Sequence, residues 1–537
     1  MSEFLKQHKL YLTPLSPIHM GSGEDFEPTN YVVGDGFLQL FNPGNVTLPD
    51  NLRDQLLNIA KRKLPDVSTK SGSQECVKYI LDLHNWFKRN DSVIARSAYH
   101  FVPVSNSIAQ EYEKAFGHAR NEGETINQFI IERTEYNPIT GQVYIPGSAF
   151  KGTVRTTWLE YLSENNRSKL VSLKGRDLEK GYEKALLNSF DKDPMRLFKP
   201  ADFIPNGKNA YTSIQYSINK YKKQPDDASK NPQGLKVRRE SILQGQYRAF
   251  VSNSVIQQTQ NKIKIDQLTM RELAKQSNEY YLKRFNKECQ LMSDRGFLNE
   301  AWFKSTQALL NELNMQLQMG DVMLIRLGKN TGAESKTDDK HASIKIMQAR
   351  GTPAKHEKTT KTLWLASSID KAQSNMLPFG WALVEIDPTG EYPELKSWCM
   401  ANNVTQEVEE KFVELHKKQQ KVQIEAAAKA KEEEEKLKAK AEAEQQAAEA
   451  LASMNDAERL VHDVLEIVAQ PNLQAGNEAG QKALADVITK LNEALNMLDK
   501  DQRLIGEALP FAKLKDIVSK KKEKEVKPLL AKLRGEA

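Results

Sequence analysis

The sequence predicts an α+β body, then a charged helix and a small C-terminal helical bundle. Extended segments in residues 1–400 are interrupted by helical ones without regular βαβ alternation, which favours an α+β body over a doubly wound parallel sheet. Residues 425–450 contain almost only Ala, Glu, Lys and Gln. Beyond them, apolar residues recur at helical spacing. A chain of 537 residues also exceeds the size of one hydrophobic core.

The first half of the body begins with an apparent strand at Lys9–Leu15. Asp35-Gly36 tolerates positive φ, so it predicts a hairpin turn between extended segments on either side. Those segments are Tyr31–Val33 and Phe37–Leu40. Apolar spacing then predicts helices over residues 50–62 and 74–88, a strand at Gln142–Ile145 and a helix from Ala149 to Leu162.

The second half of the body mixes strands, long helices and loops. Residues 202–248 predict two strands around a basic surface loop. Two helices follow, at about 264–292 and 297–316, and then a strand at Val322–Leu327. Residues 328–361 are rich in Gly and Lys and predict a flexible loop that could clamp a nucleic-acid backbone, or one that is merely solvated. A last strand, Ala382–Ile386, closes the body near residue 400.

The segment after Val408 predicts helices only. Its Glu-first pairs four residues apart, such as Glu432–Lys436, stabilise a solvated single helix. Leu460, Val464 and Val468 mark an amphipathic helix that ends at Pro471. A second helix follows at Leu484–Leu498, and a third is expected at Lys513–Leu533, broken by Pro528. The expected domains are therefore residues 1–200, 201–400, 405–453 and 454–537.

Charge and composition restrict the function classes. Residues 1–400 hold 54 Lys and Arg against 45 Asp and Glu, whereas residues 401–537 hold 23 against 26, so the basic excess lies in the body and favours a polyanionic partner. No apolar stretch is long enough to cross a bilayer, and Met1–Leu10 lacks the apolar core of a secretory signal. Cys76, Cys289 and Cys399 match no zinc spacing. A cytoplasmic protein without metal or cofactor is expected.

The most specific stretch is Tyr144-Ile-Pro-Gly-Ser-Ala-Phe-Lys-Gly-Thr-Val-Arg155. Gly147 permits a sharp turn, and Ser148 could cap the helix that follows. Lys151 and Arg155 are four residues apart, so they share a helix face near the positive helix end. This arrangement suits a phosphate backbone, although a solvated basic first turn is an equal alternative.

Four stretches together resemble one family. Tyr144–Arg155 fits a PGSxxKGxxR signature, and Leu15-Ser-Pro-Ile-His-Met-Gly-Ser-Gly23 is similar to an N-terminal run of the same proteins. Ile325-Arg-Leu-Gly-Lys-Asn-Thr-Gly332 resembles their second Gly-rich loop, and Leu377-Pro-Phe-Gly-Trp-Ala382 the start of a late strand. The family is the CRISPR-associated RAMP superfamily, and the order of the motifs resembles the fifth Csm subunits of type III-A effector complexes. The resemblance covers roughly residues 9–390.

The resemblance implies two ferredoxin-like (RRM-like) modules without a nuclease centre. It implies a structural subunit that binds crRNA at its 3′ end, caps the backbone filament, and contacts the backbone RAMP subunit and the small subunit, with target RNA as a further candidate partner. The expected RNA-binding residues are His19, Gly21, Ser22, Gly23, Ser148, Phe150, Lys151, Gly152, Arg155, Lys329 and Lys336.

Two alternatives remain open on the sequence. Some RAMP relatives process crRNA without metal by using a histidine, whose pKa near neutrality suits proton transfer, so His19 is a candidate general acid or base. The simpler interpretation is that His19 orders its turn or contacts RNA. The resemblance does not cover residues 405–537, so the chain could also be a scaffold that recruits a maturation nuclease through this extension.

Overall fold

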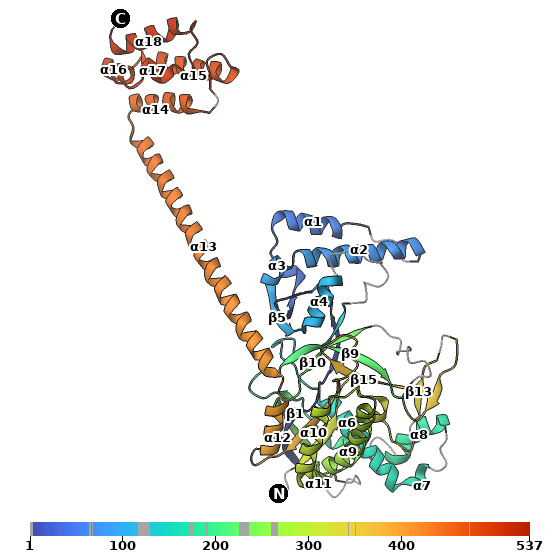
Figure 1. The fold of residues 1–537 in the computed structure, drawn as a ribbon. Helices are drawn as coiled ribbons and strands as arrows, with labels where there is room; N and C mark the ends of the chain where they lie inside the picture. The colour runs from blue at the N-terminus through green and yellow to red at the C-terminus, as the bar shows by residue number, and fades with distance from the viewer. Residues whose placement is uncertain are drawn as a thin grey trace. The chain divides into compact units, whose positions relative to one another are not determined.

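The computed structural model describes residues 4–63, 66, 68–115, 129–170, 175–187, 192–224, 236–258, 267–341, 343–348, 351–471 and 473–536. The chain divides into two compact units, residues 1–416 and 417–537. The first unit combines helices and sheets, and the second is made of helices in its described part (Figure 1). The predicted α+β class is confirmed. No helix among the described residues is both long and apolar enough to cross a membrane.

The first sheet of the body contains both its first and its last strand. Its strand order is β12-β17-β1-β11-β7, and a short sixth strand, β8, pairs with β11. All its pairs are antiparallel, and Leu12 in β1 faces Val384 in β17. The strands are β1 (Leu5–Pro14), β7 (Phe198–Lys199), β8 (Ile204–Pro205), β11 (Phe250–Gln257), β12 (Val322–Arg326) and β17 (Trp381–Ile386). Helices α6 (Gly147–Asn165) and α9 (Met270–Asp294) pack against each other and against β12.

A second sheet has the order β16-β15-β9-β10-β6-β2. Only the β10–β6 pair is parallel. The strands are β2 (Gly21–Phe26), β6 (Ile131–Thr134), β9 (Thr212–Tyr221), β10 (Val237–Ile242), β15 (Thr362–Ser367) and β16 (Leu377–Pro378). The two strands predicted around a basic loop are confirmed as β9 and β10, and residues 225–235 lie outside the described part. Both sheets draw strands from both sides of residue 200, so the domain boundary expected there does not separate them.

The predicted hairpin forms a third, three-stranded sheet. β3 (Tyr31–Gly34) pairs with β4 (Phe37–Phe41), which pairs with β5 (Ala98–Pro103). Asp35 and Gly36 have φ of 53° and 79°, so both central turn residues are left-handed, as this hairpin type requires. Three helices accompany this sheet, namely α1 (Asp50–Ala60), α2 (Lys70–Arg89) and α4 (Asn106–Ala115), which agrees with the helices predicted over 50–62 and 74–88.

Three local expectations differ from the structure. Residues 142–145 form only isolated bridges, Val143 to Tyr136 and Ile145 to Phe203, because no neighbouring strand continues the pairing. The helix predicted from residue 264 begins at Met270, where Thr269 and Glu272 form a capping box. The predicted loop at 328–361 contains an antiparallel hairpin of β13 (Ile344–Ile346) and β14 (Lys355–Glu357), and its residues 342, 349 and 350 lie outside the described part.

The last helices of the body are buried on one side. Helices α10 (Glu300–Glu312) and α11 (Asn314–Met319) bury the predicted face of Leu309, Leu310, Leu313 and Leu317. α12 (Pro393–Asn402) packs on α10. α13 (Thr405–Ser453) is 49 residues long, and its first turns belong to the body, with Val408 and Leu415 buried. The predicted charged segment is thus helical, but it begins as part of the body.

The second unit has a hydrophobic core of its own. Its helices after α13 are α14 (Asp456–Ala469), α15 (Glu478–Ala494), α16 (Asp499–Ala508), α17 (Phe511–Leu514) and α18 (Glu523–Arg534). The third predicted helix was wrong, because residues 515–522 form turns between α17 and α18, and α18 continues through Pro528. One proline costs a single helical hydrogen bond there, and buried Val526, Leu530 and Leu533 hold the helix on the core.

Candidate nucleic-acid interface

Two of the predicted Gly-rich motifs meet in the body. The run His19–Gly23 includes the first three residues of β2, and Gly328 and Lys329 follow β12. The Lys329 backbone N–H donates to the His19 carbonyl at 3.0 Å. Gly328 has φ of 88°, and a Cβ there would lie 2.3 Å from the His19 carbonyl oxygen. Only glycine allows this approach, and we call the assembly of residues 19–23, 328, 329 and Glu132 the glycine junction.

Glu132 of β6 is the central acid of the glycine junction. Its Oε2 lies 3.0 Å from Lys329 Nζ, 3.1 Å from Arg239 Nε and 3.4 Å from His19 Nε2. The His19 imidazole, Lys329 and Arg239 lower the pKa of Glu132 to about 2, so it is ionised at neutral pH. Asp25 is also nearby, and its pKa is raised by burial and by Glu132. The negative charge of the acids at the junction is therefore nearly balanced by the positive charge of Lys329 and Arg239.

His19 is fully buried at the junction. Its side chain has 0% exposure, and its Nδ1 lies 2.7 Å from the Glu240 carbonyl oxygen. The two ring nitrogens thus face protein groups, Glu240 on one side and Glu132 on the other. A general acid or base must come within hydrogen-bond reach of its substrate. The structure instead places His19 where it holds the junction in position.

The glycine-serine run is the accessible edge of the junction. Gly21 and Gly23 are exposed, and Gly23 has φ of 84°. Ser22 Oγ donates to the Arg133 carbonyl at 3.0 Å, which fixes the run to β6. The Lys329 side chain passes over Gly21, because a Cβ at Gly21 would lie 2.6 Å from Lys329 Cε. The structure therefore brings together His19, Gly21, Ser22, Gly23 and Lys329.

The second group of predicted residues lies on helix α6, and its cations are already engaged. The Gly147 N–H donates to Asp202 Oδ1 at 2.7 Å, so a carboxylate occupies the helix start that we expected to bind phosphate. Lys151 Nζ donates to the Phe198 carbonyl at 2.9 Å, and burial with nearby Lys199 lowers the pKa of Lys151. Arg155 pairs with Asp193 at 2.6 Å and Glu183 at 2.9 Å.

Three more residues of the same motif have different surroundings. Phe150 is fully buried, with its ring centroid 5.1 Å from that of Phe203, so the expectation that it contacts RNA is corrected to a packing role. Ser148 and Gly152 are exposed. Ser148 does not cap the helix, because the N-cap position is Pro146 and no side chain caps it there. The residues of this motif thus mainly hold α6 in place, and its cations bind groups of the body.

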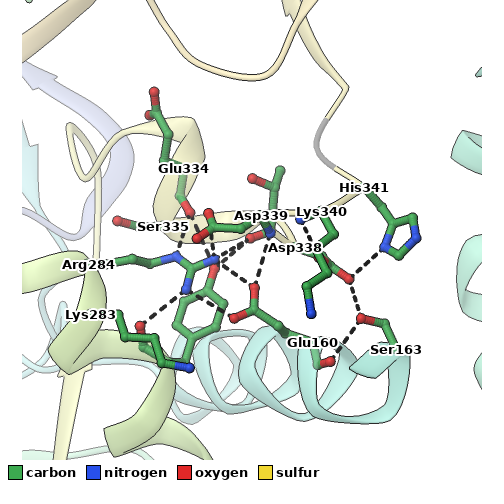
Figure 2. Close-up of polar contacts among 12 residues, drawn as sticks. Glu160, Ser163, Lys283, Arg284, Glu334, Ser335, Asp338, Asp339, Lys340 and His341 are labelled. Carbon is green, nitrogen blue, oxygen red and sulfur yellow. Dashed lines mark hydrogen bonds and ion pairs between the residues drawn. The ribbon is translucent and has the colours of Figure 1, made fainter. Parts of the chain in front are cut away.

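A buried polar cluster holds the segment that carries Lys336 (Figure 2). Arg284 of α9 is 6% exposed, and it binds both carboxylate oxygens of Glu160 in α6, at 2.7 and 3.2 Å. The same guanidinium donates to the carbonyls of Glu334 and Thr337, each at 3.1 Å, and lies over the Tyr280 ring. Two helices therefore grip the backbone of residues 334–337.

Asp338 provides a second anchor for the same segment. It accepts a hydrogen bond from Ser163 of α6, and its Oδ2 lies 3.0 Å from His341 Nδ1 (Figure 2). It also accepts a hydrogen bond from the Tyr182 hydroxyl at 2.6 Å. Ser163 and His341 both contact the carboxylate rather than each other, so this is not the geometry of an activated serine. Together with Arg284, Asp338 fixes residues 334–341 to the helices. We call these contacts the anchor cluster.

The anchored segment and the residues that follow it present lysines to solvent. Lys336, Lys345, Lys355 and Lys358 are exposed, and none has an ion-pair partner among the described residues. By contrast, Lys340 pairs with Glu164 at 2.9 Å and Lys361 with Glu357 at 3.8 Å. Lys345 and Lys355 lie on β13 and β14, so the predicted flexible loop contains a pair of hydrogen-bonded strands. No group of three or more metal-ligating side chains occurs in the described part of the chain.

The comparisons with known proteins identify the family. A family model for the RAMP superfamily matches residues 11–311. The chain belongs to the RAMP superfamily. Two of the four RAMP-like motifs, 15–23 and 144–155, lie within the matched residues, and the motifs at 325–332 and 377–382 lie beyond them. The search of curated proteins gives no match.

Two of the solved structures similar to this RAMP chain contain Csm proteins. One is a chain of a cryo-EM structure of a Csm–crRNA–target RNA ternary complex, with 16% identity and a TM-score of 0.43 over 71% of this chain and 100% of that chain. Another is the crystal structure of T. onnurineus Csm5, with 14% identity and a TM-score of 0.38 over 70% of this chain and 99% of that chain.

Sequence reasoning missed the partners of the predicted residues. Glu132, Arg239, Arg284 and Asp338 carry the interactions of the glycine junction and the anchor cluster, yet none is among the predicted RNA-binding residues. Arg284 and Glu160 are 124 residues apart, so no local spacing links them. The sequence signal for the anchor cluster was the group of acidic residues at 334, 338 and 339 within a segment otherwise rich in lysine.

Proposed function

We propose that this RAMP chain is a non-catalytic, crRNA-binding structural subunit of a type III CRISPR effector complex. In this proposal it holds the 3′ end of the crRNA and caps the backbone filament in antiviral defence, and its body is built of two ferredoxin-like modules. Its partners are the crRNA, the backbone RAMP subunit and the small subunit. Membership of the RAMP superfamily and the four motifs support the proposal.

The observation that carries the RNA-binding part is a set of four exposed lysines on the anchored segment and on and beside the β13–β14 hairpin, which we call the lysine hairpin: Lys336, Lys345, Lys355 and Lys358. None of these four lysines has an acidic partner in the described structure, so a phosphate backbone would displace no carboxylate from them. Lys336 Nζ does donate to the Gly328 carbonyl, at 3.5 Å. A backbone contact of this kind positions RNA without reading its sequence. A subunit that binds crRNAs of different guide sequences requires this kind of contact.

The anchor cluster gives the lysine hairpin a rigid base. Arg284 is bonded to Glu160 and to two backbone carbonyls, and Asp338 to side chains of two helical segments. A lysine on a fixed base loses less freedom on binding than one on a free loop. The hairpin can therefore grip a strand at a defined position relative to the body.

The burial of His19 favours a binding subunit over the alternative crRNA-processing endoribonuclease. A fully buried imidazole with protein groups at both nitrogens does not reach a ribose hydroxyl. Removing it should loosen the glycine junction rather than abolish a chemical step. The proposal therefore expects that purified protein, incubated with crRNA precursor with and without Mg²⁺, produces no cut that depends on His19.

Charge reversal of the hairpin tests the RNA grip. In the variant Lys336→Glu, Lys345→Glu, Lys355→Glu and Lys358→Glu, less crRNA should copurify with the chain. The salt dependence of binding, measured as the slope of log affinity against log salt, should weaken by about 0.7 for each phosphate that the variant no longer binds. All four side chains are exposed, so the fold should persist.

The matched control reverses four other exposed lysines of the body, Lys208, Lys275, Lys287 and Lys304. It changes the net charge equally, so it should keep its crRNA content if the hairpin is the grip. If both variants lose RNA to the same degree, or neither does, the hairpin is not the RNA-binding element.

A further inference from the structure

The charges of the second unit are separated along the chain. Residues 454–510 hold 5 Lys and Arg against 10 Asp and Glu, whereas residues 511–536 hold 9 against 4. Mixed charges would suffice for solubility, and a field of one sign is the arrangement that attracts a charged partner. We call residues 511–536, which comprise α17, α18 and the turns between them, the lysine segment.

Some cations of the lysine segment are engaged within the unit, and others are exposed. Ion pairs engage Lys522 with Glu525 at 2.5 Å and Lys527 with Glu523 at 2.7 Å. A further set of lysines is exposed and has no ion-pair partner in the described part of the chain, namely Lys515, Lys520, Lys521, Lys524 and Lys532. The hydrogen bond from Lys527 lowers the pKa of Glu523, and the charges of Lys520 and Lys515 lower it further, so the turns and the start of α18 share one positive field.

The fold holds these lysines on a stable surface. Leu514, Ile517 and Val518 of the turns and Val526, Leu530 and Leu533 of α18 are buried in the core of the unit. The cations stand between these anchored positions. The backbone that carries the lysines is therefore already ordered before a partner binds, which lowers the entropy cost of binding.

Three kinds of partner could meet such a surface, and one fits its chemistry. A membrane-surface helix needs apolar side chains to insert beside its cations, and no large hydrophobic side chain of residues 511–536 is among the exposed ones. A protein partner usually needs aromatic or arginine anchors at the interface centre, whereas this surface presents compact lysine charges. A flexible strand of phosphates needs only charge at its own spacing.

We propose that the lysine segment is a second phosphate-binding surface, independent of the body, which takes a single-stranded nucleic acid. It extends the function proposed above, in which only the body grips the crRNA. Lysines at this surface recognise phosphates and not bases. RNA and DNA strands share that chemistry, so the test includes both.

The test uses the full-length chain and photoreactive thiouridine- or thiothymidine-labelled oligonucleotides of one sequence. Cross-linked peptides from residues 511–536 are expected with RNA, with DNA or with both, beside any cross-links to the body. The variant Lys515→Glu, Lys520→Glu, Lys521→Glu and Lys524→Glu should lose these cross-links at least tenfold. Its salt slope for binding should weaken by about 0.7 for each phosphate that these lysines neutralise in the unmodified chain.

A charge-matched control distinguishes this site from general attraction. It reverses four exposed lysines elsewhere in the second unit, Lys438, Lys440, Lys482 and Lys500, and should keep the cross-links. Equal loss in both variants, or no cross-link within 511–536 to either strand, overturns the proposal. Binding to vesicles of anionic lipid that depends on these lysines, without binding to either oligonucleotide, also overturns it, in favour of a membrane surface.

Discussion

Replacing Arg284 with Met should lower the free energy of unfolding of the body by about 3–5 kcal/mol, the usual cost of removing one partner from a buried ion pair. Glu160 is 12% exposed and would keep its charge without the guanidinium that binds both its oxygens. The carbonyls of Glu334 and Thr337 would lose their donor as well. The substitution should also release the lysine hairpin and weaken RNA binding.

Denaturant unfolding of the full chain, followed by a probe in the body, measures this effect. Lys283→Met is the matched control, because Lys283 precedes Arg284 on the same helix but pairs with Glu279 at the surface, where both are more than half exposed. An exposed pair contributes about 0–1 kcal/mol. Similar decreases in the two variants would show that the anchor cluster does not stabilise the body.

Truncation of the chain should have a sharp threshold within α13. The first turns of this helix bury Thr405, Val408 and Leu415. The Phe412 ring lies 5.0 Å from that of Phe37 and 6.1 Å from that of Tyr211, between ring centroids. A chain ending at residue 404 should therefore expose the apolar surface of the body that these turns cover, which we call the apolar seat. Such a chain should melt at a lower temperature and tend to aggregate, since removing each large buried side chain costs about 2–5 kcal/mol.

A chain ending at residue 424 is the corresponding control. It keeps the whole seat and two further turns, so its body should melt like that of the full chain and still bind crRNA. Phe412→Ala in the full chain should reproduce part of the destabilisation. If the two truncations melt alike, the start of α13 does not belong to the body.

The elements that the sequence predicted well depend on local chemistry. The hairpin at 31–41 follows from the positive φ that Asp35-Gly36 tolerates, and the start of α9 could have been placed from Thr269 and Glu272. The face of Leu309, Leu310, Leu313 and Leu317 follows from helical spacing. In each case the residues that decide the structure are within a few positions of one another.

The site was harder to predict, because its interactions join distant segments. Arg155 looked like a phosphate ligand, but Glu183 and Asp193 take its donors from 28 and 38 residues away. Phe150 could stack on a base or pack in a core, and a single apolar residue in a motif does not distinguish the two. The lysines of 336–358 were recognisable from composition, whereas their anchor, Arg284 with Glu160, required the tertiary fold.

One measurement tests the central claim most directly. The effector complex is purified with crRNA that carries a photoreactive nucleotide near its 3′ end, irradiated, and digested for mapping of cross-linked peptides. The proposed function predicts cross-links from 3′ nucleotides to peptides within residues 328–361, strongly reduced in the four-lysine hairpin variant and intact in the charge-matched control. Cross-links to this chain only from the 5′ end of the crRNA, or a defined cut that disappears in His19→Ala while binding persists, would contradict it.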